Sequence, residues 1–212
     1  MQTQLKKRET CAAGIASLFD LRDRLMKSLL SLQKELSREE FNAIPFLNAN
    51  GYHNKTIAYS LWHIFRIEDI VAHTLINGDD QVSLSGNYQE RIHSPIITTG
   101  NELVKRQIAD SSAQLNLQAL FAYILEVKDS TEEIVRGLSY GELTRKISAE
   151  RKELLKSLQV VSADENAAWL IDYWCGKDVR GLIQMPFSRH WIMHTEACLR
   201  IKNRIHPQTQ TR

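Results

Sequence analysis

Apolar residues recur at helical spacing through most of the chain, and this periodicity constrains the fold more than any other feature. Between residues 9 and 36, steps of three and four positions connect one stripe of leucines: Leu18, Leu21, Leu25, Leu29 and Leu32. Residues at this spacing share one face of an α-helix. Alternation of apolar and polar positions, which marks a half-buried strand, is almost absent. The sequence therefore predicts an all-α fold.

Three further segments have the same periodicity, and we expect long helices at about 56–77, 115–138 and 187–205. Gly78 follows the first of them as a C-terminal cap, and Pro186 lies in the first turn of the last. Four long amphipathic helices are typical of a four-helix bundle. No repeat, low-complexity tract or linker divides the chain, so residues 1–212 are predicted to form a single domain.

Smaller helices are expected at about 101–109 and 142–158, and another is expected to begin at 162–165, a segment with capping-box spacing. The last two of these lie between the third and fourth long helices. Residues 78–100 are predicted to form a long loop rich in Ser, Gly, Asn and Thr. A loop of that length is often functional, and a plain surface excursion is the alternative.

The charge balance excludes some classes of partner. With 27 basic and 25 acidic residues the net charge is +2, too small to indicate nucleic-acid or membrane-surface binding. No apolar run reaches the roughly 18 residues that span a bilayer, and the N-terminus lacks the apolar stretch of a secretory signal. Cys11, Cys175 and Cys198 form no CxxC pair. We therefore expect a cytoplasmic protein.

Two histidines on the last predicted helix are the first candidates for chemistry. His190 and His194 are four residues apart, so both imidazoles extend from one helix face and can bind one cation. Trp191 stands where the zinc-protease motif requires Glu, which excludes that mechanism. Among seven histidines a pair at this spacing arises by chance in about one chain in five, so the pair alone is weak and could consist of ordinary helix histidines.

His63 is the candidate for a third ligand. It lies in the middle of the 56–77 helix, and Tyr59, Ile67 and Ile70 share its face, which places it toward the bundle interior. His73 lies ten residues further along and about 80° around the helix, where we expect either an exposed histidine or one stabilised by the dipole at the helix C-terminus.

Three imidazoles from two helices suit zinc or nickel better than calcium or magnesium. With His63, His190 and His194 as the only protein ligands, a position stays open for water or a small-molecule substrate, as in catalytic zinc sites. This predicts a metal-dependent enzyme such as a transferase or hydrolase. Two alternatives stay open: a metal- or ligand-binding module without catalysis, and a helical protein whose histidines only form hydrogen bonds in its core.

Other residues have weaker claims. Cys198, four residues beyond His194, could be a fourth ligand, although a small core residue is more usual there. Glu68, Asp69 and Glu196 are candidates to orient the histidines, with surface charge as the favoured alternative. A set of aromatic residues is interpreted as core packing rather than as the wall of a substrate site: Trp169, Tyr173 and Trp174.

Two stretches resemble the DinB/YfiT-like superfamily of small metal-binding four-helix proteins. TIAYSLWHIFRIED, residues 56–69, is similar to the family's second helix, and MPFSRHWIMH, residues 185–194, is similar to its closing His-x-x-x-His helix. Helix order and length also agree, so the likeness covers most of the chain. After His194 the sequence Thr195–Cys198 departs from the family's His-Arg-Gly-Gln-like run, so the resemblance is to the superfamily rather than to one subfamily.

The resemblance implies an up-down-down-up bundle with a long second connection and a divalent metal on His63, His190 and His194. It also implies a substrate class, because characterised relatives include transferases and isomerases that use low-molecular-weight thiols such as bacillithiol or mycothiol. A homodimer is a further implication of the resemblance. No nucleic-acid partner is implied.

Overall fold

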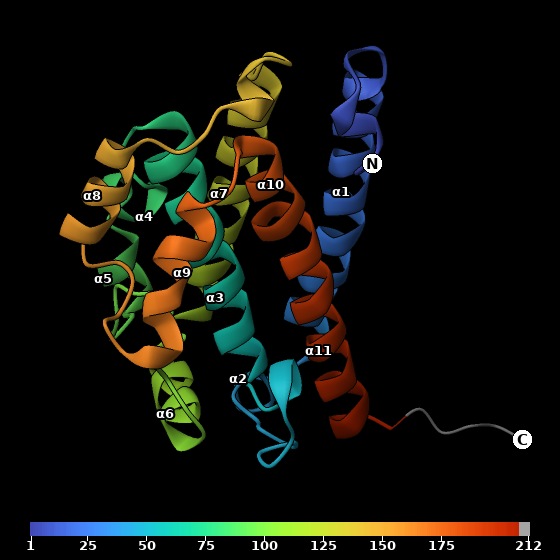
Figure 1. Ribbon diagram of the computed structural model, residues 1–212. Coiled ribbons are helices and arrows are strands. Elements are labelled where there is room, and N and C mark those ends of the chain that lie inside the picture. Colours follow the sequence, from blue (N-terminus) through green and yellow to red (C-terminus); the bar gives the residue numbers. More distant parts are fainter. Residues whose placement is uncertain (208–212) are drawn as a thin grey trace, which may run out of the picture.

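The structure is a computed structural model and describes residues 1–207. Four long helices stand side by side in it (Figure 1). They are α1 (Cys11–Glu35), α3 (Ile57–Asp69) with its π-helical continuation η4 (Ile70–Asn77), α7 (Leu117–Gly137), and α11 (His190–Ile205), which follows α10 (Val179–Gln184) and the π-helix η6 (Met185–Arg189). Across residues 1–207 there is no strand, only an isolated bridge between Lys146 and Asp178. The prediction of an all-α bundle is confirmed.

The long helices follow the up-down-down-up order, in which the first and last helices run in one direction and the two middle helices run in the opposite direction. In Figure 1, α1 and α11 run from top to bottom, whereas α3 and α7 run from bottom to top. α3 packs against both α7 and α11, and α1 packs against α11 and α7. Because α3 and α7 are parallel, the chain between them returns along the whole bundle, and residues 78–116 form this connection (Figure 1).

Short elements fill the connections. They are α2 (Arg38–Phe41), α4 (Val82–Ser85), α5 (Tyr88–Ile92), α6 (Arg106–Gln114), α8 (Ala149–Ser157), α9 (Glu165–Cys175) and the 3₁₀ turns η1 (Gln4–Lys6), η2 (Arg8–Thr10), η3 (Gly51–His53) and η5 (Glu142–Thr144). Thr56 caps α3, with its side chain accepting a hydrogen bond from the Tyr59 backbone N–H. Gly78 ends η4 with a φ of 86°, so the predicted cap is confirmed.

The long connection differs from its prediction as a loop without helices. Residues 78–100 contain α4 and α5, and α4 is held by Asp69, whose carboxylate accepts the backbone N–H groups of Val82 and Ser83 at 2.8 and 2.9 Å. This cap comes from the preceding long helix rather than from the local sequence. The helix expected at 101–109 lies instead at α6, since the residues around Asn101 form a turn.

Several predicted helix starts are also corrected. Within 142–158 only η5 and α8 are helical, because Ser148 caps α8 by accepting the Arg151 N–H. The expected box at 162–165 does not form, and Asp164 is the cap of α9, accepting the Asn166 N–H. The last helix begins earlier than expected: α10 continues through η6 into α11, and Pro186 sits inside that wider turn.

A buried layer of charges separates two apolar clusters. One cluster contains Leu18 of α1 and the other contains Met26, and Arg22 between them is fully buried. Arg22 Nη2 lies 2.8 Å from Glu68 Oε1, and its Nε lies 3.0 Å from Glu132 Oε1. Glu68 and Asp69 are completely buried, so their interpretation as surface charges is wrong.

Candidate metal centre

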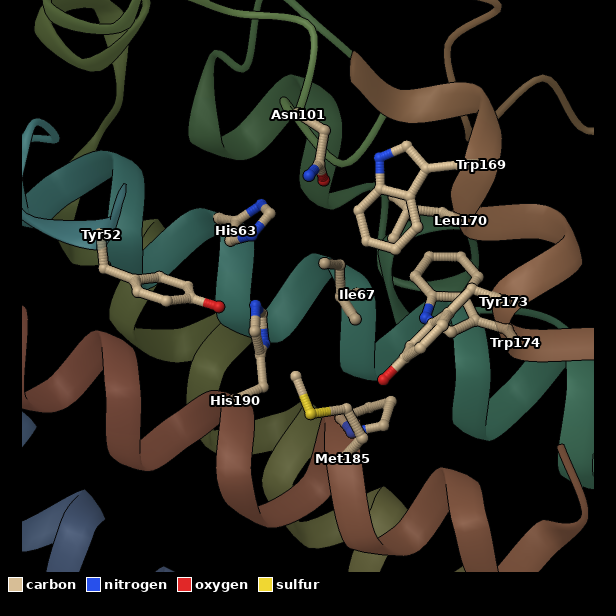
Figure 2. Close-up of a pocket in the computed structure, with 11 residues that line it drawn as sticks. Tyr52, His63, Ile67, Asn101, Trp169, Leu170, Tyr173, Trp174, Met185 and His190 are labelled. Atoms are coloured by element: carbon tan, nitrogen blue, oxygen red, sulfur yellow. The ribbon is translucent and has the colours of Figure 1, made fainter. Parts of the chain in front are cut away.

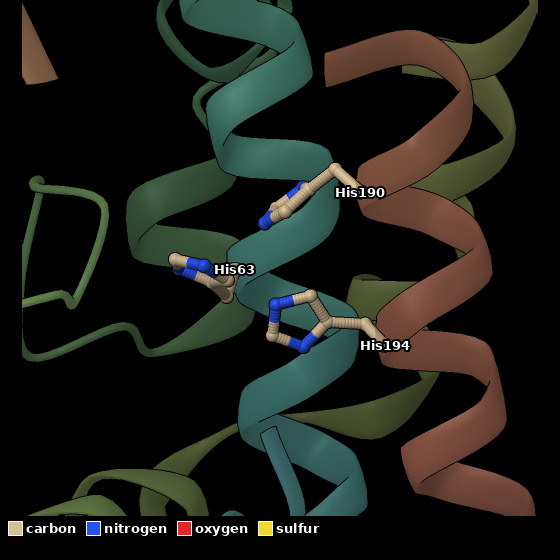
Figure 3. A group of neighbouring side chains, drawn as sticks. All are labelled: His63, His190 and His194. Atoms are coloured by element: carbon tan, nitrogen blue, oxygen red, sulfur yellow. The ribbon is translucent and has the colours of Figure 1, made fainter. Parts of the chain in front are cut away.

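Helix spacing brings His190 and His194 to one face of α11, and α3 presents His63 opposite them (Figure 3). The ring centroid of His63 lies 4.9 Å from that of His190 and 4.8 Å from that of His194. The centroids of the His190 and His194 rings are 4.6 Å apart. One nitrogen from each residue lies within 4.8 Å of the others. The three histidines that were candidates from the sequence therefore lie close together in the structure.

The cluster is buried, and three of its six ring nitrogens are buried without a hydrogen-bond partner. His63, His190 and His194 are 5%, 6% and 1% exposed. Nδ1 of His190 and both nitrogens of His194 lack a hydrogen bond. Leaving a buried polar atom unpaired costs about 1–3 kcal/mol, so three such atoms in one place need an explanation. A shared cation would satisfy one nitrogen from each ring.

Burial also keeps these rings in the form that a metal requires. Removal from water lowers the pKa of His63 to about 4, against the weaker opposing effect of its hydrogen bond to Thr99. The same desolvation holds the pKa values of His190 and His194 well below the usual range. All three imidazoles are then neutral near pH 7, each with a lone pair. Two nitrogens on one zinc ion are about 3.4 Å apart, a separation that small side-chain rotations can reach from 4.8 Å. The cluster could hold a metal ion.

Residues 78–100, the first part of the long connection, orient His63. The Nδ1 atom of His63 lies 2.7 Å from the Thr99 carbonyl oxygen, which fixes Nδ1–H as the donor and directs the Nε2 lone pair toward the other rings. Tyr59 Oη donates to the Gly100 carbonyl at 2.9 Å, and its ring stacks on His63 with centroids 5.3 Å apart. Arg66 Nε donates to the Ile97 carbonyl at 2.9 Å. These hydrogen bonds to His63, Tyr59 and Arg66 of α3 support the interpretation of residues 78–100 as a functional segment.

A cavity of about 220 Å³ adjoins the cluster (Figure 2). His63 and Ile67 of α3 line one side, with His190 and Met185 on another. Helix α9 closes it with four residues: Trp169, Leu170, Tyr173 and Trp174. Trp169 is 51% exposed and Tyr173 is 36% exposed. The interpretation of these two aromatics as core packing is therefore wrong, whereas Trp174, at 2% exposure, is buried as expected.

Two further cavity residues come from irregular segments and were missed by the sequence analysis. Tyr52 of η3 extends its hydroxyl toward His190 in Figure 2, and its ring meets the His194 ring edge-on at 4.8 Å. Asn101 also lines the cavity and lies between His63 and Trp169 in Figure 2. Neither Tyr52 nor Asn101 belongs to a helical pattern in the sequence that would have placed it at the site. The only local signal near Tyr52 is Gly51, whose φ is 76°.

The weaker candidates have other roles. Cys198 is fully buried and does not belong to the group of converging ligand atoms found in residues 1–207. Burial raises its pKa to about 12, so it remains a thiol. Glu196 is exposed to solvent and lies 3.1 Å from Nε2 of His53, which joins η3, and hence Tyr52, to α11. Glu68 and Asp69 contact other partners rather than the three histidines.

His73 is 4% exposed, so its predicted exposure is wrong. Its Nδ1 lies 2.9 Å from Asp79 Oδ1 and its Nε2 lies 3.0 Å from Ser130 Oγ, the order of groups in a serine hydrolase. Ser130 lies within α7, however, where backbone N–H groups serve the helix, and Glu133 and Glu142 border the adjoining cavity. An oxyanion there would be repelled. We assign these contacts a structural role.

Comparison with known proteins gives a likeness in fold. No protein-family model and no curated protein matches the chain. Among solved structures, the chain is similar to a conserved protein from Enterococcus faecalis, with a TM-score of 0.60 and 14% sequence identity over 91% of this chain and 94% of that one. At this identity the likeness shows a shared fold and nothing about activity. No helix within residues 1–207 is long and apolar enough to cross a membrane.

Proposed function

We propose that this protein is a metal-dependent enzyme that holds zinc or nickel on His63, His190 and His194 and acts on a small molecule in the adjoining cavity. The observation that carries the proposal is the convergence of three buried imidazoles. His190 and His194 have ring nitrogens without a hydrogen-bond partner, and His63 and His190 line that cavity. A site closed on all sides by protein would suit a structural metal, whereas three ligands beside a cavity leave room for a guest.

An ion bound in this way would supply Lewis acidity, which lowers the pKa of water or of a thiol. The chain's own residues would do the rest. Thr99 orients His63, and the Tyr52 hydroxyl faces the open side of the cluster, where it can donate a hydrogen bond to the reacting group (Figure 2). The apolar walls from α9 exclude water from the guest.

The resemblance to the DinB/YfiT-like superfamily supports the same proposal and adds thiol transfer to hydrolysis as the reactions to test. In either reaction the attacking atom, sulfur or oxygen, forms a bond to an electrophilic carbon, and the leaving group departs from that carbon and takes up a proton.

Metal analysis tests the ligand set. Tag-free wild-type protein should contain about one zinc or nickel ion per chain, and His63→Gln and His190→Ala should each lower the content at least tenfold. His206→Ala, at an exposed position, and Cys198→Ala, at a buried position beside α3, should retain the wild-type content. Circular dichroism establishes that each variant is folded. Full metal content in folded His63→Gln would overturn the assignment.

Activity assays test the enzyme proposal separately. Metal-loaded protein is assayed for hydrolysis of aryl esters and amides, and for transfer of small thiols to aromatic electrophiles. We expect turnover in at least one assay, with at least a hundredfold loss in His190→Ala. A metal-loaded wild type that is inactive in all of them would favour the alternative, a binding module without catalysis.

A further inference from the structure

We infer that the cavity beside the three histidines takes a small, uncharged aromatic molecule, with its ring against Trp169 and Tyr173 and its polar substituent toward the histidines. The inference deepens the proposed function and rests on it for the direction in which the reactive end of the guest lies. The preference for a neutral planar ring rests on the cavity walls alone.

The charge of the lining limits the guest. No Lys, Arg, Asp or Glu side chain lines the cavity. Lys177 lies 4.1 Å from the Tyr173 ring and Lys55 lies 5.5 Å from the Tyr59 ring, but neither ammonium group lines the cavity. In the metal-free protein, an ionised guest would lose its hydration without gaining a countercharge from any side chain that lines the cavity.

The α9 wall favours a planar guest. The Trp169 and Tyr173 rings meet at 70° with centroids 5.5 Å apart, so together they form a corner. Trp169 Nε1 donates to the Asn166 carbonyl at 2.9 Å, which holds the indole in place before anything binds. Large exposed aromatic side chains next to a cavity commonly mark a binding surface. A ring entering this corner can stack on one wall and meet the other edge-on.

The volume limits the size of the guest. A cavity of about 150 Å³ is enough to bind benzene, and this one measures about 220 Å³. The difference leaves room for a substituent of a few heavy atoms. Pockets for drug-sized ligands usually begin near 300 Å³. One ring with a short side group therefore fits within the cavity.

The polar groups determine which way the guest lies. Asn101 Oδ1 accepts a hydrogen bond from Thr99 Oγ1 at 2.8 Å, so Nδ2 is left to donate. Tyr52 offers a hydroxyl close to His190 (Figure 2). In Figure 2, Tyr52 lies at the histidine end, opposite the Trp169 ring, and Asn101 lies between His63 and Trp169. A carbonyl substituent would accept from them while the ring stays at α9.

Binding of three matched probes to the metal-free protein tests the inference. Benzamide is neutral and planar, benzoate has the same ring with a charge, and cyclohexanecarboxamide is neutral but not planar. We expect benzamide to bind at least fivefold more tightly than either of the others by calorimetry, and to change the tryptophan fluorescence. Equal binding of benzoate or cyclohexanecarboxamide, or no binding of benzamide, would overturn the inference.

Matched variants locate the bound ring. Trp169→Ala should weaken benzamide binding about fivefold, the value of one aromatic contact, and Leu125→Ala, an equally accessible position on α7, should leave it unchanged. An unchanged affinity in Trp169→Ala would place the ring elsewhere and refute the inference. Because these titrations need no metal, their failure is distinct from failure of the proposed function, which metal content and turnover decide.

Discussion

The three imidazoles of the cluster are buried, and this burial lowers their pKa values, so that protonating any of them in the folded chain is unfavourable. The physical cause is desolvation, which penalises the charged ring. For His63 the nearby charge of Lys55 acts in the same direction, and only the Thr99 carbonyl opposes it. The chain thus carries three strong lone-pair donors whose availability varies little above pH 6.

This has a consequence for stability in acid. The pKa of His63 is about 4 when folded and 6.5 as a free group, so below pH 6.5 the unfolded chain binds a proton that the folded chain rejects. Stability of the metal-free protein should therefore be complete above pH 6.5 and fall as the pH drops toward 4, by about 3 kcal/mol for His63 alone.

Urea denaturation of metal-free protein between pH 7.5 and pH 4.5 measures this loss. His63→Gln removes the titrating group, so its stability should fall less steeply over the same range than that of the wild type. Carboxylate effects are common to both proteins and cancel in the difference. Parallel pH profiles for the two would contradict the assigned pKa shift.

The residues of the candidate site divide by the signal that the sequence carries. His63, His190 and His194 could be found because helical spacing places side chains in three dimensions. Trp169 and Tyr173 were misassigned because an amphipathic pattern marks an apolar face without saying whether another element covers it. Tyr52 and Asn101 lie in segments without periodicity, and only the folded chain brings them to the cavity.

At the scale of single elements, the start of α3 has a buried cap. Thr56 is fully buried, and its Oγ1 accepts the Tyr59 N–H at 3.0 Å and lies 2.6 Å from Ser112 Oγ of α6. The cap therefore fixes the first turn of the helix that carries His63 and ties it to α6.

Thr56→Ala should lower the free energy of unfolding by about 1–2 kcal/mol, since the alanine leaves the first turn of α3 without its cap. Thr56→Ser keeps the hydroxyl and should recover most of the loss. Urea denaturation of the three proteins provides the comparison. Equal stability of the alanine and serine variants would show that the hydroxyl contributes nothing.

The elements that the sequence did not predict have two physical causes. α4 is capped by Asp69 from another helix, and the wide turn at η6 lets the chain pass Pro186 without ending the helix. Both depend on contacts between distant segments or on a rare helix type. The four long helices could be predicted because each satisfies its backbone hydrogen bonds internally and repeats its apolar face many times.

At the scale of the whole molecule, the buried charges on α1, α3 and α7 lie between the two apolar clusters and connect these helices. Arg22 bridges Glu68 and Glu132, and Glu68 also accepts the Trp191 indole N–H at 2.6 Å. Trp191 directly follows His190, so the charged layer lies beside the histidine cluster. Each of the four long helices contributes to this arrangement.

Arg22→Met should lower the free energy of unfolding by about 3–5 kcal/mol, because Glu68 would be left buried without its cation. Glu132 would keep its contacts with Lys128 and Arg136. Arg24 provides a matched control two residues away: it pairs with Asp20 at 3.0 Å on the surface, where both side chains are mostly exposed. Arg24→Met should cost less than about 1 kcal/mol. Thermal or urea unfolding of both variants distinguishes them, and similar losses would contradict the burial of the Arg22 pair.

His63 belongs to the second long helix and its two companions to the fourth, so more than half of the chain lies between them. An ion shared by all three would act as a cross-link, restricting the unfolded polypeptide far more than an ion gripped within one helix. The same separation sets an order of events during synthesis. Such an ion could be bound by all three histidines only after residues 63–194 have been translated and α11 has left the ribosome.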